Sequence, residues 1–220
     1  MVTEELIREI FHIEDQTLIQ ELSAISTIEN FQKRQTIYDI GEKHTHFYIL
    51  LSGIAYTWFP DEKQRLNTTC FFLERGNLLN VEGINKITAV GAKALVDSEV
   101  CMIPIEKARL LFDQYPALIW SYIRGLQKMM IYLCVVNNQR MHLTAEERYR
   151  WFCEKWPTID ELATNQQIAS FLMIRPESLS RLRAQLKQSA GNKDKEIANV
   201  LVSKDMKLEY LDIRQKIDEI

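Results

Sequence analysis

The residues best suited to chemistry are the charged side chains gathered between positions 175 and 187. This segment holds four bases and one acid: Arg175, Arg181, Arg183 and Lys187, against Glu177. Its formal charge is therefore +3, within a chain whose net charge is −3. A local positive face on an acidic protein suits phosphate contact, because Lys and Arg displace the counterions of a nucleic acid.

The pattern around these residues predicts two short helices joined by a tight turn, over residues 165–187. Apolar residues of the first helix fall at helical spacing, at Ile168, Ala169 and Leu172. The turn is 173–175, and Pro176 takes the first position of the second helix, where proline is tolerated. The second helix has an apolar stripe at Leu179, Leu182 and Leu186, opposite a polar face of Glu177, Ser178, Arg181 and Gln185. This layout is typical of a helix-turn-helix, whose second helix enters the DNA major groove, although any α-rich domain can contain two such helices.

Length and composition allow one large domain or two small ones. The chain has 220 residues, with 46% hydrophobic and 26% charged residues, which is ordinary for a globular protein. No pair of cysteines has the close spacing of zinc or iron–sulfur ligands, so no metal is predicted at Cys70, Cys101, Cys134 and Cys153. We expect reduced thiols, no signal peptide, no membrane segment and a cytoplasmic location.

The first half of the chain changes from a helical period to a period of two. Amphipathic helices are predicted over 3–13, with Thr3 as a cap, and over 15–25. Short segments rich in β-branched and aromatic residues then predict strands at 35–38, 47–51, 54–59, 68–73 and 94–96. Strands of this length and spacing suggest an antiparallel sandwich or barrel. The stretch 80–91 has no clear period and predicts a loop or short helix.

A short helix is predicted at 106–112, and Pro116 opens a long one that ends near 140. One face of the long helix is apolar, with Ile119, Tyr122 or Ile123, Leu126, Met129 or Met130, Leu133 and Val136. This face predicts either a dimer seam or packing onto the protein's own barrel. Gly125 lies inside the helix, where glycine costs about 1 kcal/mol relative to alanine, and Asn137-Asn138 marks a candidate hinge.

A capping box at Thr144 and Glu147 predicts the start of the next helix, which Pro157 ends. We expect a loop before the helix-turn-helix and a break at 189–193. The mixed charge of 193–220 favours a helix, with a hairpin over 198–211 as the alternative.

The order of these segments resembles that of the CRP/FNR family of bacterial transcription factors. Ile40 to Gly53 resembles the glycine-turn-strand signature of the family's cyclic-nucleotide-binding-type roll, with Gly41 and Gly53 at the turns. Ala94 to Pro104 resembles the last strand of that roll. Residues 146–181 resemble the winged-helix module, and Pro-Glu-Ser-Leu-Ser-Arg at 176–181 resembles the recognition helix of a Bacteroidetes-like branch.

The resemblance implies an α+β fold with three parts: an antiparallel β-roll (a double-stranded β-helix), a long dimerisation helix at about 116–140, and a C-terminal winged helix-turn-helix. It implies an effector-type domain over 1–140 and a DNA-binding domain over 141–220 with an atypical tail. It also implies a homodimeric, sequence-specific transcriptional regulator of double-stranded DNA that is not an enzyme, with RNA polymerase as a candidate partner.

By the same resemblance, Glu177 and Arg181 are the base readers. They lie four residues apart on one helical face, with Ser178 beside them, and Arg and Glu can recognise guanine and cytosine respectively. Arg175 is expected near phosphate, as are Gln166 and Gln167 of the first helix. Met173 stands where the family usually has glycine, and Pro176 replaces a basic residue found in some members, so the target sequence cannot be carried over.

The effector region departs from the family pattern. Cyclic-nucleotide-binding members hold the phosphate with an arginine, but segment 76–88 contains none, and Glu82 is out of step. Lys86 is the candidate substitute for the missing arginine. A buried phosphate without a guanidinium is costly, so we expect no tight binding of cAMP or cGMP, no cofactor, and an unknown effector. A pocket is expected between the roll and the long helix, lined by Leu79, Asn80, Glu82, Tyr122 and Leu126.

Three alternatives remain open on the sequence. His44 and His46 have the spacing of a cupin metal site, but the expected glutamate and third histidine are absent, which favours surface imidazoles at the start of a strand. Cys70 or Cys101 could act as a redox sensor, although buried strand cysteines are usually inert. The third alternative is a β-roll regulatory or ligand-sensing protein that acts through a protein partner.

Overall fold

The computed structural model describes residues 2–62, 65–80 and 87–192, and side chains up to Leu186. Its contacts divide the chain into two compact units, residues 1–179 and 180–220. The predicted wing and the predicted helix or hairpin in 193–220 lie outside the described residues, as do Glu82 and Lys86.

Two capped helices open the chain. In α1 (Glu4–Phe11), the Thr3 hydroxyl accepts from the backbone N–H of Leu6 at 3.2 Å, which confirms the predicted cap. In α2 (Gln16–Ile25), the Asp15 carboxylate accepts from Leu18 N–H at 3.0 Å. Each cap satisfies a donor that the helix itself leaves unpaired.

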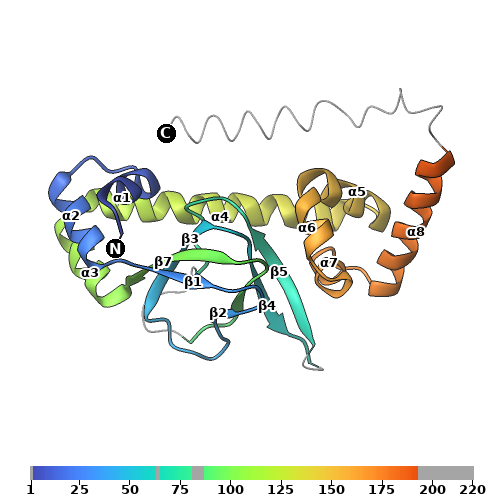
Figure 1. Ribbon diagram of the computed structural model, residues 1–220, viewed down its shortest axis with the longest axis horizontal. Helices are drawn as coiled ribbons and strands as arrows, with labels where there is room; N and C mark the ends of the chain where they lie inside the picture. The colour runs from blue at the N-terminus through green and yellow to red at the C-terminus, as the bar shows by residue number, and fades with distance from the viewer. Residues whose placement is uncertain (1, 63–64, 81–86, 193–220) are drawn as a thin grey trace. The chain divides into compact units, whose positions relative to one another are not determined.

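In the described part of the chain, seven antiparallel strands form two sheets. The three-stranded sheet has the order β1 (Thr27–Phe31), β7 (Ser98–Pro104), β3 (His46–Ser52). The four-stranded sheet has the order β2 (Thr36–Tyr38), β6 (Gly91–Ala94), β4 (Ala55–Pro60), β5 (Leu66–Phe72). Together with the helices they confirm the predicted α+β class and its β-roll (Figure 1).

Alternation along β3 separates two hydrophobic cores. Phe47, Ile49 and Leu51 face outward from the roll and pack with α1, α2 and α3 (Ile105–Gln114). Tyr48 and Leu50 face the interior of the roll, where the second sheet contributes Tyr38, Ala55, Cys70, Phe72, Ala92 and Ala94. The period of two thus assigns neighbouring residues of one strand to different cores.

Helix α4 (Pro116–His142) is the long helix and runs past both cores (Figure 1). Tyr122 and Leu126 pack on the outer core, while Met129, Tyr132 and Leu133 pack on the roll interior. Most of the apolar face predicted as a dimer seam or barrel contact therefore packs on the protein's own roll. Asn137 and Asn138 lie inside α4, so the predicted hinge is not a break in the helix.

The C-terminal helices are α5 (Ala145–Lys155), α6 (Pro157–Leu162), α7 (Asn165–Phe171) and α8 (Pro176–Asn192). Both halves of the predicted capping box at Thr144 and Glu147 are formed. Tyr149 and Phe152 are buried on α5, and Trp156 caps its end.

Four local expectations were wrong. Strand β1 was not predicted, because only Phe31 of its five residues is buried and its pattern is that of an edge strand. Helix α6 replaces a predicted loop, because one and a half turns are too short to show a period. The strand expected at 94–96 ends at Ala94, and α8 continues through the break expected at 189–193 as far as Asn192.

Gly53 shows why the roll needs glycine at its second predicted turn. Its φ is +88°, which L side chains rarely adopt. A Cβ there would lie 2.3 Å from the Ser98 hydroxyl and 2.5 Å from the Asp97 carbonyl oxygen. Gly41 also has positive φ, at +81°, but faces open space.

Candidate DNA-binding and effector sites

Helix α7 is the first helix of the predicted helix-turn-helix. Gln167 N–H donates to the Thr164 hydroxyl at 3.2 Å, and Thr164 N–H donates to the Gln167 side-chain oxygen at 2.8 Å. This capping box was missed in the sequence, although Thr and Gln stand at the required spacing. The apolar residues beyond it are fully buried: Ile168, Ala169, Phe171 and Leu172.

The turn after α7 places Met173 in the left-handed region, with φ +54°. Ile174 N–H donates to the Ala169 carbonyl at 2.9 Å and closes the turn. The sequence already identified this position as one that usually holds glycine. A non-glycine residue in this conformation costs about 1–2 kcal/mol, so the surrounding contacts must hold the turn in place.

Helix α8 begins at Pro176, as predicted, and the Asn165 side chain donates to the Pro176 carbonyl at 2.9 Å. Glu177 and Arg181 are exposed on this helix one turn apart, and Ser178 is half-buried. Arg175, just before the helix, is also exposed. Chemically, this helix offers a guanidinium and a carboxylate to solvent at i, i+4 spacing.

Gln166 and Gln167 differ in their environments. Gln166 is exposed on α7, where the predicted phosphate contact remains open to it. Gln167 is half-buried, forms the cap with Thr164, and bonds to the Tyr56 hydroxyl. Burial raises the pKa of Tyr56, and the bond from Gln167 opposes that shift.

Helix α7 is docked on strand β5 of the roll. Thr68 N–H donates to the Ser170 hydroxyl at 2.8 Å, and the rings of Phe71 and Phe171 lie 5.1 Å apart. Arg140, near the end of α4, lies 4.5 Å over the Phe171 ring and donates to the Thr69 carbonyl at 2.9 Å. The first helix of the helix-turn-helix is therefore packed directly on the roll.

Two arginines lie inside this junction without an acidic neighbour among their described partners. Burial lowers the pKa of Arg140. The neighbouring Cys70 and Tyr132 side chains oppose this shift, and the Arg148 charge adds to it. The Nε atoms of both side chains are buried without a hydrogen-bond partner among the described residues. Arg148 uses Nη1 instead, donating to the Leu172 carbonyl at 2.8 Å just before the turn. Buried, partly satisfied guanidinium groups are costly, so this junction is a place where stability is sensitive to change.

The outward face of α4 carries a stripe that is apolar except at Gln127 and that we call the apolar stripe: Trp120, Ile123, Gln127, Met130, Cys134 and Met141. These residues recur at spacings of three, four and seven, the pattern of a helix–helix seam. Trp120, Met130 and Met141 are 62%, 63% and 77% exposed. Only two residues of this stripe, Ile123 and Met130, belong to the apolar face predicted from the sequence. The other residues of that predicted face, except Ile119, pack toward the roll.

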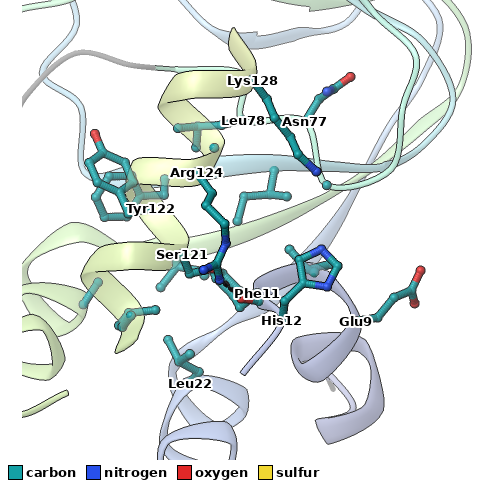
Figure 2. A pocket seen from close by; sticks show the side chains of 18 of the residues that line it. Glu9, Phe11, His12, Leu22, Asn77, Leu78, Ser121, Tyr122, Arg124 and Lys128 are labelled. Atoms are coloured by element: carbon teal, nitrogen blue, oxygen red, sulfur yellow. Dashed lines mark hydrogen bonds between the residues drawn. The ribbon is translucent and has the colours of Figure 1, made fainter. Parts of the chain in front are cut away.

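A cavity with a volume of about 270 Å³ lies beside α4. It is bounded by α1, the outer face of β3 and β7, the segment 74–78, and the first half of α4. Figure 2 shows Ser121, Tyr122, Arg124 and Lys128 of α4 around it, opposite Glu9, Phe11 and His12 of the α1 end.

Of the four predicted effector residues that the structure describes, Tyr122 alone lines this cavity. Leu79 is buried in the roll interior, and the Asn80 side chain is buried in a structural role, accepting from Tyr48 N–H at 3.0 Å and donating to the His46 carbonyl at 3.0 Å. Leu126 packs on the outer core. The predicted set therefore spans two sides of the three-stranded sheet, because Leu79 belongs to its inner side and Tyr122 to its outer side.

The histidine prediction was wrong for His44, which is only 4% exposed and packs edge-on against Tyr38 at 4.8 Å. Its position before β3 gave no sign that the 39–45 segment covers Tyr38. His46 is half-buried, and this burial lowers its pKa. Within residues 2–62, 65–80 and 87–192, no three His, Cys, Asp or Glu side chains gather as metal ligands.

The two strand cysteines are buried, as expected. Burial raises the pKa of Cys101 to about 11, partly opposed by a bond with Ser26. Burial also raises the pKa of Cys70, opposed by the Arg140 charge. A raised pKa keeps the thiol protonated and slow to react.

Comparison with known proteins finds similarity at the level of structure. No family model matches the sequence, and no curated protein matches it. FixK2 from Bradyrhizobium japonicum superposes with a TM-score of 0.64 at 17% identity, covering 76% of this chain and 86% of that one. The c-di-GMP responsive global regulator CLP of Xanthomonas campestris gives 0.65 at 15%, covering 80% and 93%. A protein from Eubacterium rectale, described as a transcriptional regulator of the CRP/FNR family, gives 0.66 at 14%, covering 82% and 87%.

These similarities establish the fold, which the chain shares with the three solved structures. In the described residues it consists of an antiparallel roll, a long helix and a C-terminal helix-turn-helix. Within the described part of the chain, no helix combines the length and apolarity needed to cross a bilayer.

Proposed function

We propose that the chain is a CRP/FNR-type transcriptional regulator, which binds specific DNA sequences as a homodimer and does not respond to cAMP. The observation that carries the proposal is the exposed pair Glu177 and Arg181, on the second helix of a helix-turn-helix in this fold. An arginine can bond guanine O6 and N7 bidentately, and a glutamate can accept from cytosine N4. Arg175 and Gln166, exposed nearby, would contact phosphate.

The test is DNA binding measured by fluorescence anisotropy as a function of salt. The expected plot of log affinity against log salt is linear and falls with salt, because phosphate contacts release counterions. Arg181→Ala should relax discrimination at one base pair by about 1–3 kcal/mol, and Arg175→Ala should weaken all sequences alike and reduce the slope by about one. Arg109→Ala, an exposed arginine on α3, is the matched control and should change neither quantity.

The homodimer rests on the apolar stripe of α4. Helix α4 is 27 residues long, or about 40 Å at 1.5 Å per residue, which is enough for a continuous seam. A two-fold axis along this seam would set two recognition helices about 34 Å apart, one turn of DNA. Met130→Glu should convert the dimer to monomer in sedimentation velocity. Leu110→Glu, which changes an equally exposed leucine on α3, should leave the dimer intact.

The lack of a cAMP response rests on two features. Segment 76–88 has no arginine to neutralise a cyclic phosphate. The roll interior is packed with the buried side chains of Tyr38, Tyr48, Leu50 and Phe72 and offers a cyclic phosphate an apolar environment. Calorimetric titration should detect no cAMP binding tighter than about 10 μM, a threshold near −7 kcal/mol. Binding tighter than that would contradict this part of the proposal.

The remaining parts of the proposal follow from the same fold. Residues 1–140 would form the effector-type domain and 141–220 the DNA-binding domain, with action on RNA polymerase in the cytoplasm. The hexapeptide 176–181 supports a Bacteroidetes-like branch. The proposal includes no catalytic activity. A protein that acts only through a protein partner is the competing class, and loss of all DNA binding in the salt titration would favour it.

A further inference from the structure

The cavity beside α4 lies on the outer side of the three-stranded sheet. Phe47 and Ile49 of β3 and Ile103 of β7 line it, and all three face away from the roll interior. The interior is a separate core, reached by Tyr48 and Leu50 of the same strand. A ligand in this cavity would therefore lie on the opposite side of the three-stranded sheet from the roll interior.

The floor of the cavity is apolar. The three strand residues are joined there by Leu22, Leu78, Ala108, Phe112, Leu118 and Tyr122. The volume of about 270 Å³ is near the lower end of ligand pockets, which run from about 300 to 1,000 Å³. At roughly 30 Å³ for a water-sized group, it has room for about nine non-hydrogen atoms.

The rim of the cavity is richer in bases than in acids. Arg75, Arg124, Lys128 and His12 face Glu9 and Glu74 there. Arg75 is already paired with Glu9 at 2.9 Å. Arg124 donates to the Phe11 carbonyl at 3.2 Å, and no carboxylate of the described residues lies within ion-pair distance of it. A guanidinium has five N–H donors, so Arg124 keeps donors for an anion. Figure 2 shows its side chain reaching from α4 toward Phe11 across the cavity.

Gly125 gives an independent indication that the cavity is a ligand site. It lies in the middle of α4, where glycine costs about 1 kcal/mol relative to alanine. A Cβ at this position would meet nothing within 4 Å, so close packing does not require the glycine. Gly125 lines the cavity, and its missing side chain leaves the α4 wall of that cavity open.

We propose that this cavity binds a small amphipathic monocarboxylate, whose apolar body lies on the strand residues and whose carboxylate pairs with Arg124. Charge complementarity selects the head group, because Arg binds carboxylates bidentately. The apolar floor favours a ligand whose body is apolar. The proposal gives a ligand class to the roll half of the proposed regulator, but its test uses no DNA, so the two proposals can fail separately.

The first test is calorimetric titration of the full-length protein with octanoate, which has ten non-hydrogen atoms. Octanoate should bind one site per chain, and 1-octanol, which lacks the charge, should bind at least ten-fold more weakly. Arg124→Gln should weaken octanoate at least ten-fold and leave octanol unchanged. Arg109→Gln is the matched control and should bind octanoate like the wild type.

The second test fills the cavity without removing a charge. Gly125→Leu should abolish octanoate binding while the circular dichroism spectrum and thermal midpoint stay at or above the wild-type values, because leucine favours the helix. Gly125→Ala adds only a methyl group and should retain binding. In Arg124→Gln the Phe11 carbonyl keeps one donor, because the Ser121 hydroxyl donates to it at 2.5 Å. If the substitution nevertheless disturbs α1, the two Gly125 variants still test the proposal.

Two outcomes would overturn the proposal. One is no octanoate binding up to 10 mM, a weak limit of about −3 kcal/mol by the affinity scale. The other is octanoate binding that both Arg124→Gln and Gly125→Leu leave unchanged, since the ligand would then lie elsewhere.

Discussion

Replacing Phe171 with alanine should test how firmly the helix-turn-helix is joined to the roll. Phe171 is fully buried, and its ring lies 5.1 Å from Phe71, 5.6 Å from Phe152 and 5.5 Å from Trp156. Arg140 lies 4.5 Å over its face. Removing the Phe171 ring leaves a cavity at the centre of this aromatic cluster. It also removes the aromatic face that contacts the buried Arg140 guanidinium.

The expected loss in the free energy of unfolding is about 4 kcal/mol. Buried Phe→Ala changes cost about 3–5 kcal/mol, and a desolvated cation–π contact adds up to about 2 kcal/mol. Whole domains are stable by only about 5–15 kcal/mol, so the variant should fold but with a much lower urea midpoint. Phe59→Ala is the matched control: Phe59 is 43% exposed, and its loss should cost less than about 1 kcal/mol.

The assay is urea denaturation followed by tryptophan emission and by far-ultraviolet circular dichroism. Trp156 reports on the aromatic cluster, while circular dichroism reports on all helices and strands. Because residues 1–179 form one compact unit, the two signals should change together. A loss below 1 kcal/mol for Phe171→Ala would refute the reasoning, since α7 would then not be packed on β5 in solution.

Three further predictions follow from local geometry. Gly53→Ala should lower the thermal midpoint far more than Gly41→Ala, because both have positive φ but only the Gly53 Cβ meets neighbouring atoms; equal effects would contradict this. Cys101 should resist iodoacetamide in the native protein at pH 8, and rapid alkylation would contradict its burial. The contribution of its buried neutral thiol to the free energy of unfolding should be full below the ordinary thiol pKa of 9.0. That contribution should decline as pH rises toward the folded pKa of about 11. Cys134, exposed on the apolar stripe of α4, should form an intersubunit disulfide under mild oxidation, seen as a dimer on non-reducing gels that Cys134→Ser abolishes; no crosslink in the wild type would place the seam elsewhere.

Features that depend on short-range chemistry were predictable from the sequence. The cap at Thr3, the capping box at Thr144 and the start of α4 at Pro116 all follow from a few adjacent residues, and the structure has each of them. The two flanking helices place the turn at 173–175, and the family resemblance marks Met173 as a position that usually holds glycine. These signals need no knowledge of distant contacts.

Features that depend on which surfaces meet were not predictable. The apolar residues of α4 surround most of the helix, so the sequence could not tell which face packs on the roll and which is exposed. His44 is buried where its ring packs against Tyr38, a contact that the local sequence pattern does not reveal. The cavity at Arg124 and Gly125 forms between α1 and α4, more than a hundred residues apart in sequence, and no local pattern marks it.

The most direct test of the proposed function is selection of duplex DNA from a random pool by the full-length protein. Glu177 and Arg181 on paired recognition helices should enrich a palindromic sequence with half-sites about 34 Å, or one helical turn, apart. Glu177→Ala/Arg181→Ala protein should lose that enrichment while keeping the fold. Recovery of a pool with no sequence preference by the wild-type protein would contradict the proposal that the chain is a sequence-specific regulator.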